Sequence, residues 1–299
     1  MQVLELNMLP ESCVAEILSL TSPSDACRSS LVSITFRSAA DSDYVWGKFL
    51  PSEYHESVWE ACDASFQFCS KKELYFLLCN PLLVGDGKMS FRLERSSGRM
   101  SYIISARELS ITWSNDPMLW VWKSIPESRP ILTHHFLLSR FSEVAELVTT
   151  SWLEINGKIT TKMLSPNTNY GAYLILKTTE RSFGLDLIPC ETSIEIGSRT
   201  LKNTAYMRCQ DAKKQQIETL FYSNRKEMMK SRVVKGDDGV MSKREDGWME
   251  MEMELELELG EFFNGGFGDE RVKMSLMEIK GHQLKGGVTI EGIEIRPKK

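Results

Sequence analysis

The sequence predicts an α+β protein with a small three-helix module, a helical linker and a larger, mostly antiparallel β-sandwich. Two observations predict it. Between residues 9 and 87, apolar residues recur at three- and four-residue spacing, as on the buried face of a helix. From about Met89 they alternate with polar residues, as in half-buried strands separated by turns. With 299 residues, the chain is long enough for two domains.

The composition excludes several classes of protein. The net charge is −5, so no overall basic field favours nucleic acid. No apolar run approaches the roughly 18 residues of a membrane span, and the N-terminus lacks the features of a secretory signal. The seven cysteines are odd in number and show no paired spacing, which argues against a disulfide framework or a zinc site. We expect reduced thiols in the cytoplasm or nucleus, with no metal and no membrane partner.

The stretch Leu9–Leu50 predicts three short helices. Pro10 suits a first helical turn, because its missing amide would be unpaired there anyway. Ser24 or Asp25 would cap a second helix. The first helix has the apolar stripe Val14, Ile17 and Leu18, the third contains Leu31, Ile34, Phe36, Ala39 and Ala40, and Tyr44-Val45-Trp46 follow. About forty residues make a small core, so the module is expected to complete its burial against a partner.

This stretch resembles an F-box. The motifs that carry the resemblance are Leu9-Pro10-Glu11, Glu16-Ile17-Leu18, Ser22-Pro23 with Asp25, Leu31-Val32-Ser33, Phe36-Arg37 and Trp46. The resemblance implies docking on the adaptor of an SCF ubiquitin ligase, which joins it to the cullin scaffold. The expected adaptor-facing residues, some shared with the module's own core, are Leu9, Pro10, Ile17, Leu18, Leu31 and Val32. A helical cap packed only on its own chain is the alternative.

Residues 51–87 are predicted to be a helical linker. Lys71 to Cys79 form an amphipathic segment, and Asn80-Pro81 ends it because the residue before proline is disfavoured in a helix. A second helical face precedes it, with Tyr54, Val58, Trp59 and Cys62. We expect Gly85-Asp86-Gly87 to form a flexible joint that marks the domain boundary.

Residues 88–299 are predicted to form the sandwich. Strands are expected at 102–105, 109–113, 171–178 and 193–196, and a helix at Ser139 to Thr149. Asn156-Gly157 predicts a two-residue hairpin turn. The charged, aromatic-poor stretch 208–247 is expected to be a mobile insertion.

Two strands near the C-terminus have distinctive patterns. Met249 to Leu259 alternates apolar residues with five glutamates, so a strand of about 36 Å would carry all five carboxylates on one solvent-facing or edge side. In the strand Gly287 to Arg296, the apolar pattern slips by one residue at Gly292. A β-bulge there would return both halves to the core and make this strand central.

The second part resembles the phloem protein type 2 family of plant lectins, the Nictaba-like lectins. The motifs are Ser105-Ala106-Arg107-Glu108-Leu109, Ile111-Thr112-Trp113, Trp120-Val121-Trp122, 141–147, Trp152-Leu153-Glu154-Ile155, 246–250, 258–263 and 292–297. The resemblance implies a jelly-roll-like sandwich that binds N-acetylglucosamine oligomers and N-glycan cores. It assigns Trp113 and Trp120 to the sugar, and between them Asn115 and Asp116 are plausible hydroxyl partners. These tryptophans could instead be core residues, as Trp122 and Trp152 are expected to be.

Together the two resemblances indicate a substrate-recognition subunit of an SCF ubiquitin ligase, without cofactor or catalytic residues. A glycosidase would need two placed carboxylates, whereas the glutamate row is better explained as the polar face of a strand. The target would be a glycoprotein or glycan, or a protein bound by loops of a sandwich that has lost sugar binding. The alternative is a cytoplasmic carbohydrate-binding or phloem structural protein without ligase function.

Overall fold

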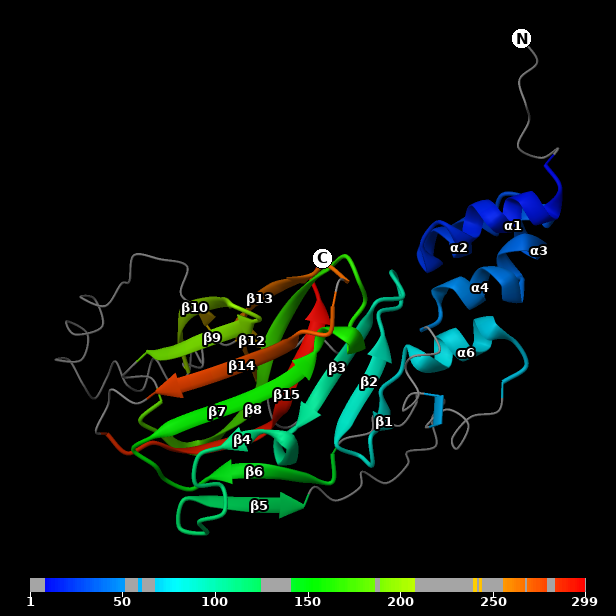
Figure 1. Ribbon diagram of the computed structural model, residues 1–299. Helices are drawn as coiled ribbons and strands as arrows, with labels where there is room; N and C mark the ends of the chain where they lie inside the picture. Colours follow the sequence, from blue (N-terminus) through cyan, green and yellow to red (C-terminus); the bar gives the residue numbers. More distant parts are fainter. Residues whose placement is uncertain are drawn as a thin grey trace, which may run out of the picture.

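The computed structural model describes residues 9–51, 59–60, 68–124, 141–185, 189–207, 239–240, 242–243, 255–266, 268–278 and 283–298. Figure 1 shows a helical part, blue to cyan, beside a larger β part. Across these ranges, no helix has both the length and the apolar character that a membrane span requires. The α+β class and the mostly antiparallel sheets are as the sequence predicts.

The helical part begins with α1 (Glu11–Ser19), α2 (Pro23–Ser29), α3 (Ile34–Asp41) and α4 (Asp43–Phe49), and α6 (Lys71–Leu78) completes it. Serine side chains cap three of these helices by accepting a first-turn amide. The cap of α2 is Ser22, which accepts from Asp25 N at 3.1 Å, and not Ser24 or Asp25, because Pro23 already occupies the first helical position. The structure also adds α4, a helix beyond the three expected.

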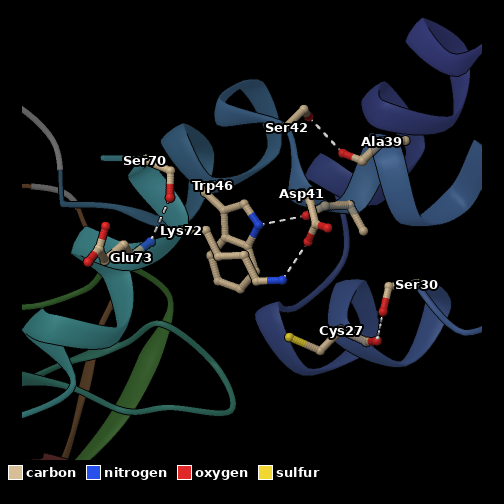
Figure 2. Close-up of polar contacts among 10 residues, drawn as sticks. Cys27, Ser30, Ala39, Asp41, Ser42, Trp46, Ser70, Lys72 and Glu73 are labelled. Atoms are coloured by element: carbon tan, nitrogen blue, oxygen red, sulfur yellow. Dashed lines mark hydrogen bonds and ion pairs between the residues drawn. The ribbon is translucent and has the colours of Figure 1, made fainter. Parts of the chain in front are cut away.

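Trp46 is the centre of this helical core. It is fully buried, and its Nε1 donates to Ala40 O at 2.6 Å. The rings of Phe49, Tyr75 and Phe76 lie with their centroids 5.7, 5.0 and 5.4 Å away. Figure 2 shows that Lys72, from α6, reaches across Trp46 to pair with Asp41 at 2.5 Å. The segment α6, predicted as a linker, therefore packs into the same core as α4.

The β part joins the helices through a hairpin between β2 (Met89–Leu93) and β3 (Met100–Ser105). Tyr75 Oη donates to Glu94 O and Arg95 O at 3.1 and 3.2 Å, and Ser24 N donates to Ser96 O at 3.4 Å. At Gly98, whose φ is +71°, an added Cβ would lie 3.3 Å from Phe49 O. The tip of the hairpin is thus held between α2, α4 and α6.

The predicted flexible joint is wrong. Gly85, Asp86 and Gly87 all have positive φ, and they form the tight turn between β1 (Leu82–Val84) and β2. Lys88 N closes this turn by donating to Gly85 O at 3.1 Å. The sheet therefore begins ahead of the predicted domain boundary.

The described residues form two sheets. The larger has the order β1-β2-β3-β15-β8-β13-β12, with β6 also paired to β15 and β5 paired to β6. Its further strands are β5 (Trp120–Ser124), β6 (Glu143–Leu147), β8 (Thr168–Phe183), β12 (Ser242–Lys243), β13 (Leu255–Asn264) and β15 (Gly286–Pro297). The smaller has the order β11-β10-β9-β14-β7-β4, comprising β4 (Ser110–Ile111), β7 (Leu153–Thr160), β9 (Cys190–Ile196), β10 (Arg199–Tyr206), β11 (Gly239–Val240) and β14 (Arg271–Glu278).

The two sheets face each other and enclose the core of a sandwich (Figure 1). A Cβ added to Gly157, in β7, would lie 2.9 Å from Ile293 Cδ1 in β15. At another point, a Cβ added to Gly260 in β13 would lie 3.2 Å from Ile194 Cδ1 in β9. Glycine is used at these points because the opposing side chains fill the space that a side chain would need.

The bulge predicted in the last strand is confirmed. The pairing of β15 with β8 shifts register between Ile290 and Gly292. The apolar residues on both sides of the shift are buried, namely Val288, Ile290, Ile293 and Ile295. Because β15 pairs with β3, β6 and β8, it is the central strand of the larger sheet, as expected.

Two local predictions are wrong. The segment predicted as a helix at 139–149 contains β6, where pairing with β5 and β15 overrides a short run of helical spacing. Asn156 and Gly157 form no turn, because they pair with Ser275 and Met274 in the middle of β7. Gly157 is needed there for close sheet packing and not for a turn.

The acidic strand is described only from Leu255 onward. Its register against β8 shifts between Glu258 and Gly260, so the alternation does not continue through the strand. Leu259 and Phe262 are buried, while Glu258 pairs with Lys298 at 2.9 Å. Residues 249–254 lie outside the described residues, as does the predicted insertion 208–247 except for β11 and β12.

Candidate functional site

A group of large aliphatic side chains is exposed on the helical part. We call it the N-terminal apolar surface, and its members, with their exposed fractions, are Ile17 (49%), Leu20 (79%), Leu31 (80%), Val32 (65%) and Ile34 (88%). Single exposed aliphatic residues are common, but a group of this kind on short helices is typical of a surface covered by a partner.

The members of this surface come from α1 and its C-terminal end, from the turn after α2 and from the start of α3. Ser38, in α3, donates to Glu11 at the start of α1 at 2.7 Å, and Tyr44, in α4, donates to Glu16, so α1 packs on both α3 and α4. Leu31 and Val32 lie in the turn that ends α2, where Leu31 N donates to Arg28 O at 3.2 Å.

The residues predicted to face an adaptor are divided between surface and core. Ile17, Leu31 and Val32 are exposed, and so is Pro10. Leu9 is half-buried against the core, and Leu18 is 3% exposed, so its side chain stabilises the helical module from within.

Sequence reasoning missed Leu20 and Ile34. The signal for Ile34 was its angular position in α3, because at 100° per residue it lies opposite the buried Ala39 and Ala40. Leu20 is the residue that ends α1, and it lies outside the stripe of Val14 and Leu18. Both residues add to the same apolar surface.

A second candidate site is the loop 112–119, between β4 and β5. Trp113 is 51% exposed with a φ of +59°, and Asn115 and Asp116 beside it are exposed. Trp120 is only 2% exposed and lies in the core, where its Nε1 has no hydrogen-bond partner. The two tryptophans predicted to hold a sugar therefore do not form a joint exposed surface.

Trp122, in β5, holds the loop 112–119 in place. Its Nε1 donates to Ser114 O at 3.1 Å, and the Arg107 guanidinium lies 3.7 Å from its ring centroid. Arg107 also donates to Glu143 at 2.7 Å, which lowers the pKa of that carboxyl group. A positive φ is uncommon for a bulky residue and costs conformational energy, so these contacts help to hold Trp113 in place.

Trp152, expected in the core, is 39% exposed and lies just before β7. Its Nε1 donates to Glu154 Oε2 at 3.2 Å. Trp122 is partly buried and packs against the core, closer to expectation. Within the described ranges, no group of three or more His, Cys, Asp or Glu side chains is arranged to hold a metal ion.

Two families match the chain. The phloem protein 2 family matches residues 99–297, and the F-box domain family matches residues 6–48. The Arabidopsis thaliana F-box protein PP2-B15 is 50% identical over 297 residues, which cover 97% of this chain and 96% of that protein. F-box protein PP2-B13 and F-box protein VBF, from the same plant, are 50% and 48% identical, each over 98% of this chain and 99% or more of their own length. Both resemblances carried by the motifs are confirmed.

Proposed function

Because the chain belongs to the F-box proteins that carry a phloem protein 2 domain, we propose that it is the substrate-recognition subunit of an SCF ubiquitin ligase. The N-terminal apolar surface is the observation that carries this proposal. Burying apolar area contributes about 25 cal/mol per Å², so an adaptor that covers these side chains gains affinity directly from them. The chain itself is then a non-catalytic subunit, with the transfer chemistry on its partners.

Co-purification of the full-length chain with the adaptor tests the proposal. Replacing Leu31 and Ile34 together by lysine should abolish co-purification, because it buries two charges in an apolar interface. The double variant Leu9→Ala, Pro10→Ala should also fail to co-purify while remaining folded.

The control is Leu201→Lys, which places one lysine on an exposed leucine of β10, and it is compared with the single variant Leu31→Lys. Leu201→Lys should co-purify like the unmodified chain. Undiminished capture of the Leu31, Ile34 double variant, with an unchanged melting temperature, would contradict the assignment of this surface. Failure of the unmodified chain to bind any adaptor would favour a cytoplasmic carbohydrate-binding or phloem structural protein instead.

For the target, we propose recognition of glycans built from N-acetylglucosamine, with Trp113 as one contact. An exposed indole held by a supported loop offers the flat apolar face on which a sugar ring can lie, and Asn115 and Asp116 supply polar groups beside it. Calorimetric titration of the full-length chain with N-acetylglucosamine oligomers and an N-glycan core should give saturable heat that Trp113→Ala removes. Absence of heat from the folded chain would direct the search to protein surfaces.

A ligase role of this kind calls for a location in the cytoplasm or nucleus. The five cysteines that the structure describes are free thiols, in keeping with a reducing compartment. A fluorescent fusion found outside both compartments would contradict this location.

A further inference from the structure

Two exposed tryptophans lie at the same edge of the smaller sheet. Ile111 pairs with Ile155, and Thr112 N extends this pairing by donating to Glu154 O at 3.1 Å. Trp113 follows Thr112 directly, and Trp152 lies two residues before Glu154 on the neighbouring strand. Since neighbouring strands lie about 4.8 Å apart, the backbones that carry the two indoles are adjacent.

Glu154 lies at this edge with its carboxylate fixed by three donors. Oε2 accepts from Trp152 Nε1 and from Thr112 Oγ1, each at 3.2 Å, and Oε1 accepts from Asn156 Nδ2 at 3.1 Å. Hydrogen bonds from Trp152 and Asn156 lower the pKa of Glu154, and Lys273 on the adjacent β14 acts in the same direction. The group is therefore a charged acceptor in one defined orientation.

The strand presents this carboxylate to solvent. Along β7, Leu153, Ile155 and Gly157 are buried, whereas Glu154 and Asn156 on the opposite face are partly exposed. A carboxylate has about four lone-pair sites, and three are used by the donors described above. A ligand hydroxyl or amide N–H can occupy the fourth and form a charge-assisted hydrogen bond.

This combination suits a sugar with an N-acetyl group. The C–H face of a pyranose lies on an indole, while its hydroxyl and acetamide N–H groups need acceptors. Because the bond to Glu154 already fixes the Trp152 ring, little side-chain freedom is lost on binding. Trp120 cannot supply this contact, since it is 2% exposed.

We propose that Trp152 and Glu154, together with Trp113, form the contact surface for N-acetylglucosamine oligomers, with Trp152 in the role that the family resemblance assigns to Trp120. The inference rests on the proposed recognition of glycans and adds the residues that perform it. Glu154 is the acceptor for ligand N–H or O–H groups, and Trp152 is both an aromatic contact and the donor that orients Glu154.

Calorimetric titration of the full-length chain with triacetylchitotriose tests it. Trp152→Ala and Glu154→Gln should each raise the dissociation constant tenfold or more. Trp152→Phe keeps an aromatic face but has no N–H donor, so it should raise the dissociation constant less than Trp152→Ala does. Trp120→Phe is the matched control and should bind like the unmodified chain, because Trp120 is 2% exposed and its Nε1 has no hydrogen-bond partner; the smaller ring leaves a gap in the core, so a lower melting temperature is expected without a loss of binding. Melting curves establish that each variant is folded.

The outcomes separate this inference from the function on which it rests. If Trp113→Ala abolishes binding while Glu154→Gln and both Trp152 variants bind normally, glycan recognition stands and this inference is wrong. If the unmodified chain does not bind, both are wrong. If Trp152→Ala does not fold, Trp152→Phe and Glu154→Gln decide the question. A loss caused by Trp120→Phe in a folded chain would also overturn it.

Discussion

Replacing Gly292 by alanine should destabilise the β part through one steric contact. Gly292 lies at the bulge of β15, between Ser105 of β3 and Ile175 of β8. An added Cβ would lie 2.1 Å from Ile104 O and 3.1 Å from the carbonyl carbon of the same residue. Both are backbone atoms of a paired strand, so no rotamer change can relieve the overlap. The strands must separate by about 1 Å or more to reach van der Waals distance.

The magnitude follows from this displacement. Overpacking in a well-packed core costs about 1–3 kcal/mol, and weakening one ladder hydrogen bond costs about 1 kcal/mol. Alanine offsets some of this, because it lowers the entropy of the unfolded chain by an equivalent of roughly 0.4–1 kcal/mol. The net loss should be about 1–3.6 kcal/mol, which lowers the melting temperature of a domain of this size by about 2–14 °C.

Thermal unfolding followed by circular dichroism measures the effect, with Gly47→Ala as the matched control. The nearest atom to a Cβ at Gly47 is Lys71 Nζ at 3.0 Å, the mobile end of a flexible side chain. Because Gly47 lies within α4, alanine should be neutral or stabilising there, by up to about 1 kcal/mol. A Gly292→Ala chain that melts at or above the temperature of the unmodified protein would refute the steric argument.

Three further outcomes are expected. Deleting Gly287–Lys299 removes most of the central strand and should leave the β part insoluble; a soluble truncation that melts cooperatively would contradict this. Tyr75→Phe removes the hydroxyl that donates to the β2–β3 hairpin and should cost about 1 kcal/mol in urea unfolding, whereas an unchanged midpoint would contradict the contact. Burial raises the pKa of Cys190 from 9.0 to about 12, so the folded chain keeps a proton that the unfolded chain releases. The contribution of Cys190 to stability is therefore complete below about pH 9 and falls between about pH 9 and about pH 12. Cys190→Ala should reduce the decline of the melting temperature over this pH range. An identical decline in the variant and the unmodified chain would contradict the prediction.

The sequence was most informative where the pattern itself carried the structural signal. The slip of apolar residues around Gly292 directly predicts a bulge, because one extra residue is the only way to return both halves of the strand to one face. The ordered motifs of the N-terminal part likewise predict its helices. They do not predict that α6, which is distant in the sequence, packs against Trp46 in the same core.

The failures share one physical cause, which is that local patterns do not specify the partners of a strand. Asn156-Gly157 has strong turn propensity, but β4 and β14 flank it on both sides and hold it extended. In the candidate sugar site, the spacing of Trp113 and Trp120 says nothing about burial. Trp152 and Glu154 lie on one side of the chain, opposite the buried Leu153 and Ile155, but only the pairing of β4 with β7 brings them beside the loop that carries Trp113.

In the ligase proposed above, the hairpin held between α2, α4 and α6 would affect how a target is presented. The bonds of Tyr75 and Ser24 and the close approach at Gly98 restrain rotation at this joint, so we expect the helices and the sandwich to move together. A target bound to the sandwich would then be held at one distance and one orientation relative to the ubiquitin that is to be transferred. The choice among the lysines of the target would then depend on the distance and angle between the helical part and the sandwich, independently of how tightly the target is bound.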